Sequence, residues 1–154
     1  MKLRIPGTGT AGAVALAVGA LVMAPAASAV DPTTADAPTT CSSQASGRAT
    51  IEARQDGTSV TFNVSTPVVW ASHYMPADFM ETTLTLSTAD GDEVTFRGKS
   101  NPPMILGDGF DSGPLTGTVA PGEVLEAESF TFEFLTFRVD CTITAPQTPG
   151  PFVF

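Results

Sequence analysis

Residues 49–65 read ATIEARQDGTSVTFNVS, and this stretch decides the fold. Val60, Phe62 and Val64 alternate with polar residues, which is the period of a strand with one buried face. Asp56-Gly57 separates this run from the preceding one and is typical of a tight hairpin turn, because glycine accepts the positive φ that such turns require. The stretch therefore predicts two antiparallel strands.

The alternation recurs at residues 83–87, 94–97 and 130–134, with turn residues between the runs. Near Phe134-Leu135 the apolar phase slips by one residue. Leu135 opens a second apolar series that ends at Ile143 and that we expect to face the core. A slip of one residue would turn the second half to the wrong face, so we expect a β-bulge at this point.

These short alternating runs predict an all-β fold, a sandwich of two antiparallel sheets with about seven strands and one disulfide. We expect phenylalanines to fill the space between the sheets, namely Phe62, Phe96, Phe130, Phe132 and Phe137.

The first 29 residues are typical of a cleavable secretion signal. Lys2 and Arg4 precede an uncharged apolar run at 11–23, and Ala27-Ser28-Ala29 has the small residues that signal peptidase requires. The run is too short for a membrane span, which needs about 20 residues. We expect residues 1–29 to be removed, 30–40 to form a flexible linker and 41–154 to form the β-sandwich. The product would be secreted or held at the cell wall.

Removing Lys2 and Arg4 leaves 5 of the 7 basic residues against 16 acidic ones, a net charge of −11. Such a polyanion repels nucleic acid and anionic lipid, so we expect no nucleic-acid partner and no membrane insertion after signal cleavage. The sequence identifies neither the envelope or extracellular partner nor the oligomeric state.

Cys41 and Cys141 are the only cysteines. In an oxidising compartment an even pair favours a disulfide over two free thiols, which also removes both sulfurs as nucleophiles or metal ligands. His73 is the only histidine, so we expect no zinc site and no cofactor. Acidic turns near Asp90 and Asp108 could hold calcium, although Asp and Gly are also what tight turns require.

The only Trp, His and Tyr lie close together as Trp70, His73 and Tyr74. One interpretation is a ligand-binding loop, since aromatic and imidazole groups bind many ligands. The other is a strand end whose Trp covers the disulfide or the core. A hydrolase would need His73 to work with an acid such as Asp78, and no nucleophile-elbow motif accompanies them.

The segment Phe137-Arg-Val-Asp-Cys141, followed by a Pro-rich stretch, resembles the last strand of an uncharacterised immunoglobulin-like domain of actinobacterial exported and surface proteins. There an early cysteine pairs with one in a late strand. The resemblance implies an immunoglobulin-like sandwich with a surface or wall-associated role, and it assigns no functional residues.

We therefore expect an exported, non-catalytic β-sandwich protein that acts by binding at the cell surface or envelope. One alternative is a small-ligand or glycan-binding module centred on Trp70, His73 and Tyr74. Another is a weak hydrolase that uses His73.

Overall fold

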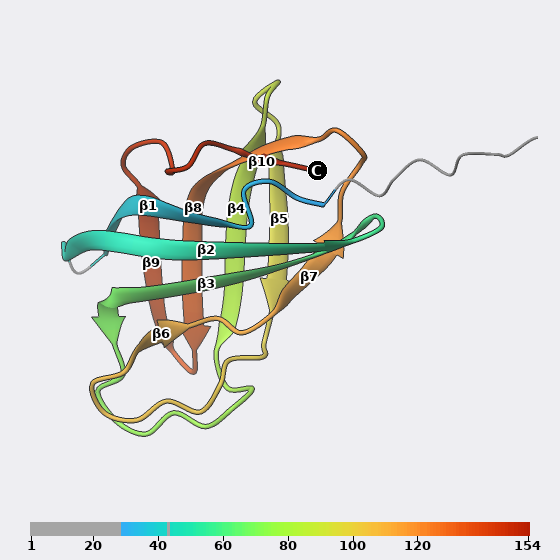
Figure 1. Cartoon of the computed structure of the whole chain (residues 1–154). Coiled ribbons are helices and arrows are strands. Elements are labelled where there is room, and N and C mark those ends of the chain that lie inside the picture. Colours follow the sequence, from blue (N-terminus) through green and yellow to red (C-terminus); the bar gives the residue numbers. More distant parts are fainter. Residues whose placement is uncertain (1–28, 43) are drawn as a thin grey trace, which may run out of the picture.

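The computed structural model describes residues 29–42 and 44–154, so the predicted secretion signal, apart from Ala29, lies outside the described residues. The described chain forms ten strands (Figure 1): β1 Thr34–Cys41, β2 Ser46–Asp56, β3 Ser59–Trp70, β4 Glu81–Thr88, β5 Glu93–Gly98, β6 Gly109–Asp111, β7 Leu115–Thr118, β8 Val124–Phe134, β9 Phe137–Ile143 and β10 Phe152–Val153. In this part of the chain no helix is long and apolar enough to cross a bilayer.

All strand pairs are antiparallel and follow the order β10-β8-β4-β5-β7-β3-β2-β1-β9. Because β8 also pairs with β9, the hydrogen bonding closes into a ring. Figure 1 shows two layers, with β9, β8, β4 and β5 in one and β1, β2 and β3 crossing them in the other. The all-β antiparallel fold with one disulfide is confirmed. The ten strands are joined in one continuous sheet, whereas we expected about seven strands in two sheets.

The hairpin predicted at 49–65 is formed by β2 and β3, with Ala53 opposite Phe62 and a positive φ at Gly57. Phe62 lies at the centre of the core, with its ring centroid 4.8 Å from that of Phe96 and 5.4 Å from that of Phe152. Four of the five predicted core phenylalanines are buried. The prediction for Phe137 is wrong, because its side chain is exposed.

The expected linker at 30–40 is mostly strand. β1 lies between β2 and β9, and its Ala35 and Ala37 side chains are buried. Threonine favours strands, and alanine is small enough to fit where the two layers approach. The prediction of a flexible linker is therefore wrong for residues 34–40. They form a half-buried strand although they contain few apolar residues.

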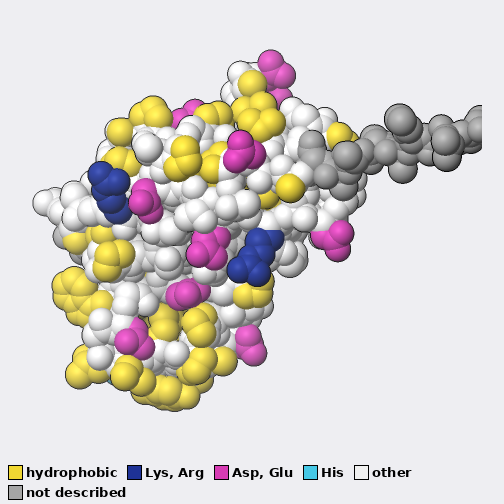
Figure 2. All heavy atoms as spheres, viewed as in Figure 1, with side chains coloured by type: hydrophobic (Ala, Val, Ile, Leu, Met, Phe, Trp, Pro, Cys, Tyr) yellow, Lys and Arg dark blue, Asp and Glu magenta, His cyan; other side chains and the backbone are white. Residues whose placement is uncertain are grey.

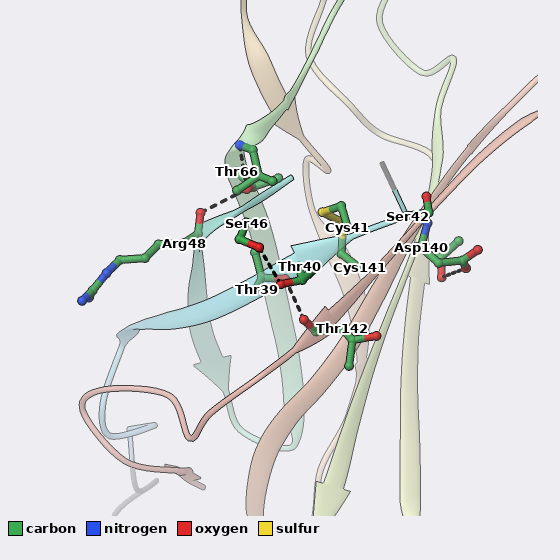
Figure 3. Close-up of a disulfide and its surroundings, with 12 residues drawn as sticks. Thr39, Thr40, Cys41, Ser42, Ser46, Arg48, Thr66, Asp140, Cys141 and Thr142 are labelled. Carbon is green, nitrogen blue, oxygen red and sulfur yellow. Dashed lines mark hydrogen bonds between the residues drawn. A yellow bond between two sulfur atoms is a disulfide. The ribbon is translucent and has the colours of Figure 1, made fainter. Parts of the chain in front are cut away.

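The predicted disulfide is present. Cys41 and Cys141 are opposite each other in β1 and β9, with Cα atoms 3.9 Å apart, and both are buried. Figure 3 shows the bond flanked by polar contacts between the strands, among them one from the Thr39 hydroxyl to the Thr142 carbonyl. The first strand of the domain is thus covalently tied to β9.

The expected bulge at Phe134-Leu135 is a chain reversal. Phe134 pairs with Phe137, which leaves Leu135 and Thr136 as a two-residue hairpin turn between β8 and β9. The phase slips because the chain turns back and starts a new strand. The irregularity in β8 lies elsewhere, opposite Thr85 and Leu86 of β4.

Candidate functional site

Six large apolar side chains at one end of the molecule are 61–81% exposed: Trp70, Tyr74, Ile105, Leu106, Leu135 and Phe137. We call this set the apolar end. It lies at the end of β3 and on the β3–β4, β5–β6 and β8–β9 connections, which Figure 1 shows at the same end of the fold. Figure 2 shows hydrophobic side chains gathered there.

Backbone hydrogen bonds hold the first two connections together. Met75 and Met104 exchange N–H···O bonds of 2.9 Å in both directions, and both side chains are buried. Ala71 accepts a bond of 2.9 Å from the Gly107 N–H. These pairings place Trp70 and Tyr74 of one connection beside Ile105 and Leu106 of the other.

The buried side-chain amide of Asn101 joins the same two connections by hydrogen bonds. The Asn101 side-chain oxygen accepts bonds from the Phe79 and Met80 N–H groups at 2.8 and 2.6 Å. Its NH₂ donates to the Pro76 and Pro102 carbonyls, each at 2.9 Å. Asn101 is 1% exposed, so its hydrogen-bonding capacity is used inside the protein. The loops that carry the apolar end are therefore anchored.

Leu106 is held at the tip of a tight turn. The Asp108 N–H donates to the Ile105 carbonyl at 3.1 Å, and the Asp108 carboxylate accepts from the Ile105 N–H at 2.8 Å. Gly107 supplies the positive φ of 93° that the turn needs. The Asp111 carboxylate likewise accepts from the Gly113 N–H. These carboxylates close turns, and the described residues hold no cluster of three or more potential metal ligands.

The β8–β9 hairpin joins the apolar end through aromatic contacts. The Phe110 ring in β6 lies 5.8 Å from that of Phe134, which stacks on Phe137 at 5.6 Å. Because β6 pairs with β3, with Gly109 opposite Trp70, this chain of rings connects the hairpin to the other two connections. Phe110 is buried, so these contacts link the hairpin to the other two connections through the core.

Leu135 occupies a backbone conformation that leucine avoids. Its φ is +53°, and it is the first of the two turn residues, where hairpins of this length strongly favour glycine. A left-handed conformation costs an L-residue about 1–2 kcal/mol. Leu135 is also 81% exposed, so burial does not offset that cost. Folding alone does not explain a leucine at this position.

The apolar end is also uncharged. Residues 67–77, 100–107 and 134–137 contain no Asp, Glu, Lys or Arg, although residues 30–154 carry a net charge of −11. Charged residues flank the segments directly: Asp78, Lys99, Asp108, Glu133 and Arg138, of which Asp108 closes the Leu106 turn.

Of the residues predicted as a ligand site, Trp70 and Tyr74 belong to the apolar end, and the Trp70 side chain is 61% exposed. His73 is exposed, and its ring Nδ1 lies 3.0 Å from the Ser72 hydroxyl. Within the described chain, no hydrogen bond links His73 to Asp78 or to another acid. The Ser72–His73 contact alone is not a catalytic triad, which needs an acid to orient the imidazole.

Sequence reasoning missed four members: Ile105, Leu106, Leu135 and Phe137. Leu135 and Phe137 were assigned to the core because their spacing continues a strand pattern. The signal that could have identified the site is apolar residues in uncharged turn segments, where turns normally carry polar residues.

A second surface feature is a polar hollow of about 440 Å³ on β4, β5, β8 and β9, lined by hydroxyls and charges. The Arg138 guanidinium there bonds Asp140 at 2.8 Å and Glu133 at 2.7 Å. Asp140, through this bond and its charge, and then Glu133 raise the pKa of Arg138. Because these charges bond one another on a solvated face, they do not form an open site for a ligand.

No protein-family model matches this chain, and no curated protein or solved structure is significantly similar to it.

Proposed function

We propose that this is an exported, non-catalytic protein that acts by binding at the cell surface or envelope, with the apolar end as its binding surface. The observation that carries the proposal is the set of six large apolar side chains exposed at one end of the fold, in segments that contain no charged residue. Export is supported by the signal-like N-terminus and by the disulfide, which suits an oxidising compartment.

The size of the apolar end favours a binding role. Three aromatic and three aliphatic side chains at this exposure present on the order of 700 Å² of apolar surface. The largest apolar patch on a typical monomer is about 300–600 Å² and is often functional. Leu106 and Leu135 stand at turn positions, which normally carry polar residues.

Kinship with immunoglobulin-like domains of actinobacterial surface proteins remains part of the proposal and rests on the pairing of an early with a late cysteine. A glycan-binding role centred on Trp70, His73 and Tyr74 would use part of the same end, since sugar rings stack on exposed aromatics. The aliphatic tips at Leu106 and Leu135 favour an apolar partner over a sugar.

The test uses the exported product and washed envelopes of the cells that make it. The Leu106→Ser/Leu135→Ser variant changes the two most exposed members, and Val153→Ser changes an exposed apolar side chain outside the apolar end. We expect the double variant to lose envelope binding and Val153→Ser to bind as the native protein does, with unchanged circular dichroism. Native-like binding by the double variant would refute the proposal.

A further inference from the structure

We infer that the apolar end docks on the surface of a bilayer of uncharged or zwitterionic lipid, with its turn tips in the interface. This inference rests on the proposed function and names the partner of the same surface. Three features favour lipid as the partner: the shape of the apolar end, the net charge of the chain and the positions of its aliphatic and aromatic residues.

The six side chains of the apolar end are exposed on different segments, and none of them lines any of five hollows on the described surface. A small ligand needs a concave site that covers most of its surface. A fluid bilayer needs no matching shape, because lipids rearrange around whatever enters them, and binding then scales with the apolar area inserted.

The net charge of the protein limits which partners can bind the apolar end. A second copy of this chain would bring another net charge of −11 toward the contact, which opposes self-association. Anionic lipid is disfavoured for the same reason. An uncharged or zwitterionic surface avoids this repulsion and matches the absence of charged residues from the three tip segments.

The residue types are placed as an interface requires. Leu106 and Leu135 occupy the tips of tight turns, where their side chains can enter the hydrocarbon. Trp70 is the last residue of β3, nearer the body of the protein. Tryptophan and tyrosine favour the headgroup level, because one end of each ring system is apolar and the other can hydrogen-bond.

This mode of contact is shallow, and it refines the expectation of no membrane insertion. Docking requires only that side chains at turn tips enter the interface while the rest of the β-structure stays in water. The anchored loops favour such docking, since Asn101 and the Met75–Met104 pairing leave less conformational freedom to lose on binding.

The experiment measures partition of the exported product onto phosphatidylcholine vesicles by co-sedimentation. Trp70 is the only tryptophan, so its emission reports on this end without background. We expect a saturable blue shift, and weaker binding when phosphatidylglycerol replaces part of the phosphatidylcholine. Leu106→Ser and Leu135→Ser should each weaken partition roughly tenfold. Val153→Ser should leave it unchanged.

Two results would overturn lipid as the partner. One is absence of native binding to phosphatidylcholine vesicles while the double serine variant still loses envelope binding. The binding surface would then stand, and the partner would be a protein or a glycan, or a second copy if the native protein sediments as a dimer. The other is equal loss of vesicle binding in Val153→Ser. Native-like envelope binding by the double variant instead refutes the proposed function.

Discussion

Replacing Leu135 with glycine should make the protein more stable and a weaker binder. The substitution relieves a left-handed conformation worth about 1–2 kcal/mol in an L-residue. Glycine also gives the unfolded chain more conformational entropy, which lowers the free energy of unfolding by about 0.5–1 kcal/mol. Because the Leu135 side chain is 81% exposed, little packing is lost. The net expectation is a gain of about 0.5–1 kcal/mol in the free energy of unfolding.

Urea denaturation followed by circular dichroism measures this gain as a rise in the midpoint of a few tenths of a molar. Leu106→Gly is the matched control, since Leu106 is similarly exposed and its φ is not among the positive ones. It should leave stability unchanged or lower it by up to about 1 kcal/mol. Both variants should bind vesicles more weakly than the native protein. If Leu135→Gly is less stable than the native protein, the argument that Leu135 is strained for the sake of binding is wrong.

Three further substitutions test the fold that supports the apolar end. Asn101→Ala removes a side chain that hydrogen-bonds four backbone groups, and should lower the free energy of unfolding by about 2–4 kcal/mol in a denaturation experiment. A decrease below about 1 kcal/mol would mean that Asn101 does not anchor the loops. Thr82→Val replaces a buried hydroxyl that has no hydrogen-bond partner among the described residues, and should raise the free energy of unfolding by about 1 kcal/mol; destabilisation would show that the hydroxyl is bonded in solution. Changing both Cys41 and Cys141 to alanine removes a disulfide that spans 100 residues, and should lower the free energy of unfolding by about 3–5 kcal/mol. Unchanged stability after reduction alone would contradict the presence of the disulfide.

Strand patterns were predictable where large apolar residues form the buried face of the strand. Val60, Phe62 and Val64 are buried in β3 as their alternation indicated, and Asp56-Gly57 marked the turn. β1 was missed because its buried residues, apart from Cys41, are two alanines and a threonine, whose burial depends on how closely the layers approach. Sequence spacing does not contain that information.

Only two of the six members of the apolar end were predicted as part of a site. Trp70 and Tyr74 attracted attention as the only residues of their types. Leu135 and Phe137 were assigned to the core because a two-residue turn without glycine resembles a continuing strand with a phase slip. Periodicity cannot separate a bulge from a reversal, since both shift the apolar series by one residue.

Docking of the apolar end on lipid is tested most directly by measuring how deeply two of its positions enter a phosphatidylcholine bilayer. Native Trp70 is compared with the Trp70→Phe/Leu135→Trp variant, whose single indole is at the hairpin tip, using lipids brominated at shallow or deep acyl positions as quenchers. We expect Trp70 to be quenched most by the shallow bromines and the indole at position 135 by the deeper ones. Emission that no brominated lipid quenches, from protein that sediments with the vesicles, would show that another surface makes the contact.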